Sequence, residues 1–475
     1  MTDVDLTIDL DHYVGRTDER LVSFNLDWHK NDEESPLWIN MSAMRIDFSN
    51  PKLRKAASAM YPARLRIGGS EGDVVCYDVP MYNSTCDSMG QNDTAFCLSM
   101  ERFEEIAKFA SDTNLELVFG LNAVWGRKNH NLTEPLDMTN IRALLKYASV
   151  NRIPLYGVEL GNEKCGPPPD VFAKDYENLK SILNELWSDE SSRPKLIGND
   201  CNTNPSYLKE WLPLLNDTVL DVLTYHRYVG YGLDPQLASE IMTPKFLDQA
   251  IDTDLTDVHS EFAPSSDLWV GEGAAAWHSG RANVTDAWVS SFWWSDALGT
   301  LAQYNHTGYQ RQTLIGGAYG LINRVNFTPN PDYYVGLLFK RLMGDVVLKP
   351  MTNPGTDGWL RVYAHCTNNG SGDLTVLAIN VANDTIFDLK SLNSVDISNY
   401  RRDQYVFTST SLNSRSLYLN GKLLQSSEDG SIPDLEPQRI HEGGPKIVLN
   451  PQTISFFVFK NGIGGFNASV CNTSQ

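Results

Sequence analysis

The sequence feature that most constrains the fold is a regular alternation between short apolar runs and amphipathic stretches. Eight runs rich in strand-forming residues are separated by segments in which apolar residues recur every three or four positions, as on one face of a helix. Eight strand-and-helix units in about 330 residues predict an α/β fold, a (β/α)8 (TIM) barrel with loop insertions. The predicted strands span residues 21–28, 64–69, 116–123, 155–163, 195–200, 222–228, 268–274 and 314–322.

Three of the predicted helices show the apolar spacing most clearly, at residues 100–110, 169–187 and 333–343. The alternative fold is a doubly wound open sheet, which often binds a nucleotide beside its first strand. The chain has no Gly-X-Gly-X-X-Gly after the first predicted strand and no Gly-X4-Gly-Lys-Ser/Thr, so the nucleotide-binding folds lose support.

The pattern changes after Val347, where short strands follow one another with glycine, asparagine and proline between them. Such a series without intervening helices predicts an antiparallel β-sandwich. Leu6–Ile8 lies in an alternating segment near the start of the chain, and we expect it to join that sandwich. The predicted domains are a catalytic barrel of residues 15–347 and an accessory sandwich of residues 1–14 plus 348–475.

The charge of the chain limits its partners. A formal net charge of −20 and a pI near 4.8 argue against nucleic acid or an anionic membrane surface. The sequence has no run of eighteen or more apolar residues, so we expect no membrane span.

Acceptor sequons for N-linked glycans are frequent, although the first residues show no signal-peptide pattern. Twelve sequons predict a glycoprotein that is secreted, extracellular or vacuolar/lysosomal, with its leader already removed. The acceptor residues are Asn40, Asn83, Asn92, Asn131, Asn216, Asn283, Asn305, Asn326, Asn369, Asn383, Asn467 and Asn472.

The seven cysteines match none of the paired spacings of zinc sites. Disulfides suit a secreted chain, and an odd number leaves at least one thiol free. Candidate pairs are Cys366 with Cys471, which would tie down the C-terminus, and Cys86 with Cys97, which would close a short loop.

Two predicted strands end in a glutamate beside a glycine, Glu163 on the fourth and Glu272 on the seventh. Barrel strands deliver the residues at their C-terminal ends to one pocket, and two glutamates there suit hydrolysis of a glycosidic bond. One would protonate the leaving oxygen and needs a raised pKa, whereas the other would attack the anomeric carbon. Asn162 could hydrogen-bond the 2-hydroxyl of the sugar. The two carboxylates supply the proton and the nucleophile, so we predict no metal ion and no cofactor.

Six short motifs lie on the predicted strands or close to them: LRIGGS at 65–70, FGLNA at 119–123, ELGNE at 159–163, WVGE at 269–272, RQTLIGG at 311–317 and NPDYY at 330–334. Together they resemble glycoside hydrolase family 79, the heparanase and β-glucuronidase family, and in particular its plant heparanase-like members. The resemblance implies a retaining mechanism, with Glu163 as acid/base and Glu272 as nucleophile. It also implies that Gly317 and Tyr319 donate to the carboxylate of a glucuronic acid.

Other candidate residues lie on the predicted strands or next to them. Arg66 would orient the nucleophile, or would belong to an ion pair at the barrel floor. His226 and Tyr228 are two apart and so face one side of their strand; Tyr228 could bond Glu272, and His226 is either a site residue or a satisfied core histidine. Further substrate-binding candidates are Asp27, Ser70 and Asn122, with Trp277 for sugar stacking, and Glu159 is expected to be a buried support.

The acidic charge of the chain contrasts with the basic cleft of the animal heparanases that the family includes. We therefore predict an exo-acting β-glucuronidase that removes terminal glucuronic acid from small glycosides or neutral-backbone glycans. The alternatives are a heparanase-like endo-β-glucuronidase, a hydrolase for neutral sugars, and a non-catalytic carbohydrate-binding protein on the same barrel.

Overall fold

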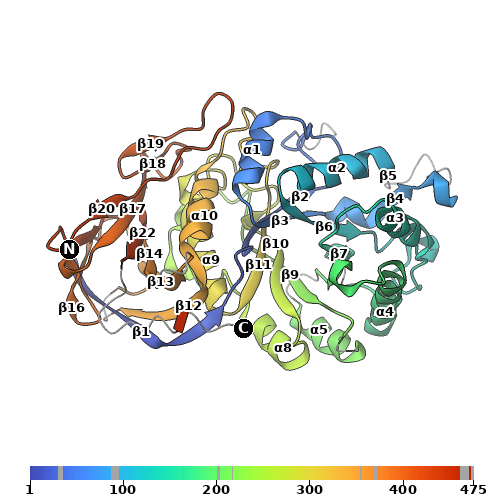
Figure 1. The fold of residues 1–475 in the computed structure, drawn as a ribbon, viewed down its shortest axis with the longest axis horizontal. Coiled ribbons are helices and arrows are strands. Elements are labelled where there is room, and N and C mark those ends of the chain that lie inside the picture. The colour runs from blue at the N-terminus through green and yellow to red at the C-terminus, as the bar shows by residue number, and fades with distance from the viewer. Residues whose placement is uncertain are drawn as a thin grey trace.

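A computed structural model of the 475-residue chain describes all residues except 30–35, 87–95, 164, 201–203, 217, 353–355, 369–371, 461–469 and 472–475. Figure 1 shows an eight-strand barrel on one side of the molecule and a large sheet on the other, with helices α9 and α10 between them.

The barrel is closed and all of its strands are parallel, which confirms the predicted (β/α)8 fold. Most strand residues are buried on both faces, as expected for strands covered by helices outside and packed side chains inside. In barrel order the strands are β2 (Val22–Asp27), β3 (Ala63–Gly68), β6 (Leu115–Leu121), β7 (Gly157–Leu160), β8 (Lys195–Gly198), β9 (Val222–Tyr231), β10 (Asp267–Trp277) and β11 (His306–Arg311).

The barrel helices begin at the signals expected from the sequence. The Ser99 side chain caps α2 by accepting from the backbone N–H of Arg102, and Pro169 is the first residue of α4. Helix α9 is buried almost all round, including Trp288, because it packs between barrel and sheet. The helices are α1 (Pro51–Ala59), α2 (Met100–Asp112), α3 (Thr139–Val150), α4 (Pro169–Leu186), α5 (Pro205–Trp211), α6 (Leu237–Ile241), α7 (Pro244–Leu247), α8 (Thr253–Phe262), α9 (Trp288–Gln303) and α10 (Pro331–Leu342).

The predicted position of the eighth strand was wrong. The strand is β11, and residues 314–322 form the loop that follows it. The sequence of β11 is HTGYQR, in which Tyr309 is the one large apolar side chain, so hydropathy favoured the more apolar segment downstream. The other seven predicted strands each overlap a barrel strand.

A short insertion lies between β3 and α2. It consists of a 3-10 turn at Ser70–Val74 and a two-stranded parallel sheet of β4 (Val75–Asp78) and β5 (Phe96–Ser99). The predicted Cys86–Cys97 disulfide closes this insertion. Among the cysteines that the structure describes, Cys76 has a free thiol, which is buried.

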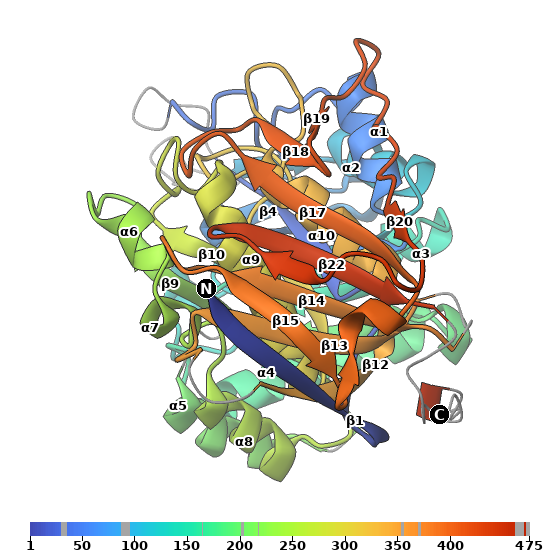
Figure 2. The same cartoon turned by 90° about the vertical axis from the view of Figure 1, so that its left-hand side faces the viewer.

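The second region is one continuous sheet, antiparallel except where β1 runs parallel to β15. Figure 2 shows blue β1 among the orange and red strands of the C-terminal part. Strands β1 and β12 carry the sheet beyond the predicted domain boundaries at 14/15 and 347/348. The strands are β1 (Thr2–Arg16), β12 (Met343–Thr352), β13 (Leu360–Thr367), β14 (Leu374–Asn380), β15 (Phe387–Leu392), β16 (Val395–Asp396), β17 (Arg402–Ser409), β18 (Leu417–Leu419), β19 (Lys422–Leu424), β20 (Gln438–Ile440), β21 (Ile447–Leu449) and β22 (Thr453–Phe459).

Both faces of this sheet are packed. One face lies on α9, where the Tyr363 hydroxyl donates to Asp296 at 2.5 Å. The other face has its own apolar cluster, in which Tyr400, two residues before β17, contacts Phe459 of the neighbouring strand β22 with ring centroids 5.8 Å apart. The same cluster joins Phe387 of β15 to residues of β14 and β22, which are not neighbours of β15 in the pairing order. The predicted disulfide between Cys366 on β13 and Cys471 is present.

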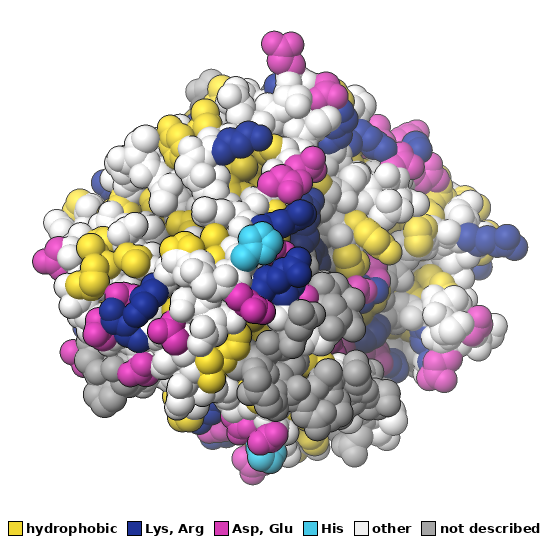
Figure 3. All heavy atoms as spheres, turned by 60° about the vertical axis from the view of Figure 1, so that its left-hand side comes forward, with side chains coloured by type: hydrophobic (Ala, Val, Ile, Leu, Met, Phe, Trp, Pro, Cys, Tyr) yellow, Lys and Arg dark blue, Asp and Glu magenta, His cyan; other side chains and the backbone are white. Residues whose placement is uncertain are grey.

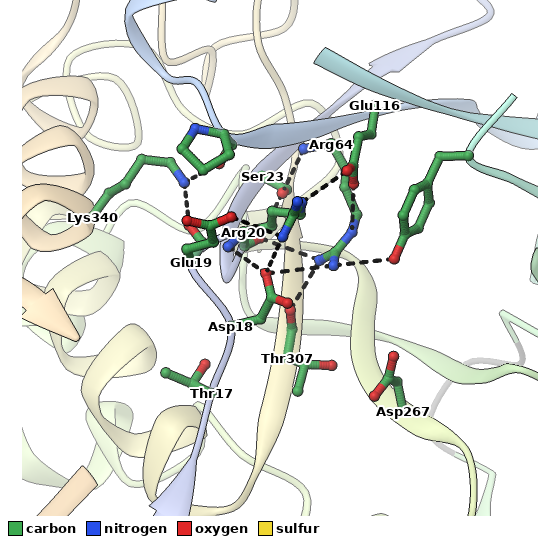
Figure 4. A network of polar contacts seen from close by, with 12 residues as sticks. Thr17, Asp18, Glu19, Arg20, Ser23, Arg64, Glu116, Asp267, Thr307 and Lys340 are labelled. Carbon is green, nitrogen blue, oxygen red and sulfur yellow. Dashed lines mark hydrogen bonds and ion pairs between the residues drawn. The ribbon is translucent and has the colours of Figure 1, made fainter. Parts of the chain in front are cut away.

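The N-terminal ends of the barrel strands are closed by the ion network of Figure 4. Arg64 lies within 3.6 Å of both Asp18 and Glu116, and Arg20 lies 2.9 Å from Glu116. Lys340 donates to backbone carbonyls here, and burial lowers its pKa to about 7. Residues at this end of a barrel contribute to stability. The ion pair at the barrel floor that was considered for Arg66 is therefore made by Arg64.

Candidate active site

Glu163 and Glu272 lie at the C-terminal end of the barrel and line one cavity of about 620 Å³. Glu272 is on β10, and Glu163 follows the end of β7 by three residues, in a turn where its φ is 53°. One oxygen from each carboxyl and one ring nitrogen of His226 all lie within 4.8 Å of one another. A larger cavity of about 820 Å³ lies at the other end of the barrel, away from both glutamates.

Arg66 on β3 links the buried groups beneath this cavity. Its Nη1 donates to Glu272 at 3.1 Å, its Nε to Glu159 at 2.5 Å, and its Nη2 to Asn162 at 3.0 Å and to Asp200. The guanidinium is 1% exposed, and its five donors match these acceptors from four different loops and strands. Arg66 therefore holds Glu272 in a fixed orientation, and burial raises the pKa of the supporting Glu159 carboxyl.

Asn162 is oriented by two donors on its side-chain oxygen. The oxygen accepts from Arg66 and, at 3.2 Å, from the backbone N–H of Gly69, while the Asn162 backbone N–H donates to Asp73. The amide therefore presents its NH2 group as the remaining donor. This arrangement suits contact with a sugar hydroxyl.

His226 on β9 lies between two carboxylates. Its Nδ1 is 2.9 Å from Glu163, and its Nε2 is 3.1 Å from Asp200. Burial lowers the pKa of His226, but the charges of Asp200 and Glu272 outweigh burial and raise it well above its ordinary value. The protonated ring therefore places its positive charge between these two carboxylates.

The pKa of Glu163 differs from the expectation for a general acid. Burial raises it, but the hydrogen bond and charge of His226 outweigh burial, so the pKa lies below its ordinary value. The sequence-based expectation of a raised pKa was therefore wrong for the free protein. The physical reason is that His226, not Glu163, holds the proton of this pair.

The other wall of the cavity comes from β2, β9 and the loop after β11. The Tyr228 hydroxyl donates to Glu272 at 2.5 Å, as predicted. Gln312 Nε2 donates to Asp27 and, at 3.3 Å, to the Tyr319 hydroxyl. Burial and the nearby Glu272 charge raise the pKa of Asp27 well above its ordinary value, which favours a neutral carboxyl that donates.

Three of the predicted site residues do not line this cavity. Arg66 lies beneath it. Asn122 is 1% exposed, with its backbone N–H bonded to Tyr77. Gly317 lines a neighbouring cavity of about 260 Å³, and a Cβ atom built on it would lie 2.6 Å from the Tyr319 ring. The predicted residues that the structure does bring together around the glutamates are Asp27, Ser70, Asn162, His226, Tyr228, Tyr319 and Trp277.

Sequence reasoning missed three groups that shape the site. Asp200 pairs with Arg66 and His226; it ends a predicted strand, so the criterion used for the glutamates could have found it. Gln312 was missed because β11 was misplaced. Trp38, in the loop after β2, donates from Nε1 to Ser279 at 2.9 Å, and no local signal distinguished this tryptophan from a core residue.

Glycines make room for the buried ions. A Cβ atom on Gly271, the residue before Glu272, would lie 2.1 Å from Asp200 Oδ1. A Cβ atom on Gly68 would lie 2.5 Å from the Arg66 guanidinium. These short glycine motifs are therefore packing requirements of the ion network.

The chain is similar to known glycoside hydrolases. A family model described as glycosyl hydrolase family 79, N-terminal domain, matches residues 3–299. Heparanase-like protein 1 of Arabidopsis thaliana is 33% identical, with 97% of this chain and 93% of the relative covered. Baicalin-beta-D-glucuronidase of Scutellaria baicalensis is 30% identical, with 89% and 86% covered.

Solved structures share the fold at low sequence identity. A GH51 arabinofuranosidase from Xanthomonas axonopodis pv. citri superposes with a TM-score of 0.66 and 11% identity, covering 97% of this chain and all of that one. A 4-O-alpha-L-rhamnosyl-beta-D-glucuronidase from Fusarium oxysporum gives a TM-score of 0.62 and 15% identity, covering 95% and 100%. At these identities the likeness supports the fold alone.

Proposed function

The chain belongs to glycosyl hydrolase family 79, and from this premise we propose that it is a retaining, exo-acting β-glucuronidase that removes terminal β-D-glucuronic acid from small glucuronides or glycans. The observation that carries the proposal is the approach of the two carboxyls. Oxygens of Glu163 and Glu272 lie within 4.8 Å, and retaining enzymes hold their carboxyl groups about 5–5.5 Å apart. An inverting enzyme needs a wider separation to admit water between carboxyl and sugar.

In the first step, Glu272 attacks the anomeric carbon and the bond to the leaving oxygen breaks. Arg66 and Tyr228 each donate to one oxygen of the Glu272 carboxylate and so fix its direction of attack. Glu163 protonates the leaving oxygen. The proton comes from the Glu163–His226 pair, since His226 Nδ1–H is already directed at the carboxylate.

In the second step, Glu163 takes a proton from water as the water oxygen attacks the anomeric carbon. The ester bond to Glu272 breaks, and the sugar leaves with its original anomeric configuration. The proton returns to the Glu163–His226 pair, so the enzyme is restored.

Tyr319 is the proposed donor to the carboxylate of the sugar. Its hydroxyl oxygen accepts from Gln312, so its own O–H must be directed at another acceptor. The neutral form of Asp27 adds a second donor beside it. Gly317 does not line the cavity of the two glutamates, so we assign this role chiefly to the side chains.

The surroundings of the cavity support a small substrate over a sulfated polymer. Arg227 lines the cavity, but its guanidinium donates to the backbone of Gln249 at 2.7 Å and lies 3.8 Å from Asp252. Glu71 adds a negative charge to the same lining. A sulfated chain needs unpaired cations along its path, so the heparanase-like endo activity is the weaker candidate.

Activity measurements on the whole chain test the proposal. Aryl β-glycosides of glucuronic acid, galacturonic acid and glucose are assayed beside heparan sulfate, with wild type and Glu272→Gln. We expect the glucuronide to be cleaved fastest, with a loss on the order of 10⁴-fold or more in the variant. Rapid shortening of heparan sulfate without release from the aryl glucuronide would contradict exo activity, and an active variant would contradict the nucleophile.

We also propose that the protein is a secreted or vacuolar glycoprotein. Eight of the twelve acceptor asparagines lie among the described residues, and all eight are exposed. The other four, Asn92, Asn369, Asn467 and Asn472, lie outside the described residues. The Cys86–Cys97 and Cys366–Cys471 disulfides suit the same oxidising compartment.

A further inference from the structure

Two exposed aromatic rings lie side by side at the rim of the catalytic cavity. Trp277 is the last residue of β10 and Tyr231 the last of β9, and the two are paired in the ladder between these strands. Their ring centroids are 4.4 Å apart with an interplanar angle of 31°. The residues are 51% and 37% exposed, whereas Trp288 and Trp293 are buried. Single exposed rings are common, but a contiguous pair beside a catalytic cavity indicates a binding surface.

The backbone beneath these rings is closely packed. The Gly232 N–H donates to the Trp277 carbonyl at 3.1 Å. A Cβ atom on Gly232 would lie 2.6 Å from the carbonyl oxygen of Gly280 and 2.7 Å from that of Trp277. The loops after β9 and β10 therefore touch backbone to backbone, and a ligand would meet rings that are already in place.

The position of the rings identifies the part of the substrate they would meet. Trp277 and His278 line the same cavity as Glu163 and Glu272. Tyr319 and Asp27, which would bind the sugar, are only 5% and 8% exposed. The sugar therefore enters the buried part, and the leaving group extends outward past Trp277.

The residues around the rings select the chemistry of the leaving group. Residues 229–233 (VGYGL) carry one hydroxyl and no charge. The imidazole ring of His278 contacts both rings, with its centroid 5.5 Å from that of Tyr231 and 5.8 Å from that of Trp277. A sugar in this place would need partners for its hydroxyls as well as a stacking face. We propose that Trp277 and Tyr231 form an aglycone subsite that takes a flat, uncharged aromatic group of a phenolic glucuronide. The proposal rests on the proposed function, because it assumes cleavage at Glu163 and Glu272.

Thioglycosides that are not cleaved test this subsite independently of turnover. Binding of phenyl and methyl 1-thio-β-D-glucuronide to the whole chain is measured by calorimetry. The phenyl and methyl 1-thio-β-glycosides of glucose and of galacturonic acid are measured in the same way. We expect the phenyl compound to bind at least about tenfold more tightly, within the range of an aromatic contact. In Trp277→Ala the ratio should fall to within about threefold, while affinity for the methyl compound stays the same.

The matched control is Trp359→Ala, which removes an exposed tryptophan of the other domain and should keep the ratio. A ratio near one in wild type with every sugar, or a ratio that survives in Trp277→Ala, would overturn the subsite. If the ratio is large and depends on Trp277 only with a different sugar, the subsite stands and the glucuronidase assignment fails. The two failures are therefore distinguishable.

Discussion

At the scale of single residues, Glu163 and His226 form the acid/base pair of the proposed mechanism. The cation lowers the pKa of the carboxyl, and Asp200 holds the cation from the other side at 3.1 Å. A carboxyl with a lowered pKa is deprotonated over more of the pH range, so by itself it lacks the proton that a general acid must donate. With a hydrogen-bonded imidazolium at 2.9 Å, it needs only a short proton shift before it protonates the leaving oxygen.

The loss of rate on removing the Glu163 carboxyl should depend on the leaving group of the substrate. In Glu163→Ala, cleavage of a methyl glucuronide should fall by about 10²–10⁴-fold, because the methoxide must leave without a proton. A dinitrophenyl glucuronide has a leaving group that is stable as an anion, so its first step should slow far less. Steady-state rates on both substrates check this, and equal losses on the two would contradict the role of Glu163.

Replacement of the histidine should move the pH dependence. The raised pKa of His226 means that its proton is present at low pH and is lost as pH rises through that raised value. In His226→Asn the proton is held by Glu163 alone, and the pKa of a carboxyl lies below the raised pKa of the His226 imidazole. The basic limb of kcat/KM against pH should therefore move to lower pH. Replacement of the exposed His12 should leave the limb in place, and an unmoved limb in His226→Asn would rule out the shared proton.

At the scale of elements, the site depends on where the barrel strands place their side chains. Arg66 and Glu159 lie near the C-terminal ends of β3 and β7, and Asp200 follows the end of β8. His226 and Glu272 lie midway along the longer strands β9 and β10. The large sheet covers α9, which follows β10, the strand that carries Glu272. Stability of the sheet thus bears on the barrel, although no sheet strand reaches the glutamates among the described residues.

Disulfide removal compares a long loop with a short one. The Cys366–Cys471 bond spans 105 residues and ties the C-terminal segment to β13, whereas Cys86–Cys97 spans 11. Replacing Cys366 and Cys471 by serine should lower the free energy of unfolding by about 2–4 kcal/mol, since a longer loop regains more chain entropy. Urea unfolding followed by circular dichroism measures both pairs. A larger loss from the Cys86 and Cys97 double variant would contradict the loop-length argument.

At the scale of the whole molecule, charge is abundant but dispersed. Figure 3 shows acidic and basic side chains interspersed over one face, with no field of a single sign. The net charge of −20 opposes binding of polyanions, and the cationic groups of the site are buried and paired. The structure also has no helix, among the described residues, that is long and apolar enough to cross a membrane.

Glycans should modify the surface of the molecule without reaching the site. Protein from its native source should lose mass on enzymatic deglycosylation, because the eight described sequon asparagines are exposed. None of these eight lines the catalytic cavity, so we expect activity on an aryl glucuronide to stay within about twofold after gentle deglycosylation. Mass spectrometry and a rate measurement on the same sample check both statements. An unchanged mass would contradict the glycoprotein assignment.

The sequence by itself determined the barrel, the added sheet and the two glutamates, because each depends on local information. Strand and helix periods are written in adjacent residues, and barrel topology brings strand ends together wherever strands are predicted. The misplacement of the eighth strand has the same cause, since the polar residues of β11 give no local hydrophobic pattern of a strand.

Only the tertiary structure decided how the site is charged and which residues share it. Arg66, Asp200 and His226 come from three separate parts of the barrel. Their electrostatic effects on the pKa of Glu163 add up according to their distances in space, and these distances cannot be read from spacings along the sequence. Burial and neighbouring charge oppose each other at Glu163, and the sign of the result follows from that sum. The placement of Gly317 outside the cavity of the glutamates was likewise settled by packing.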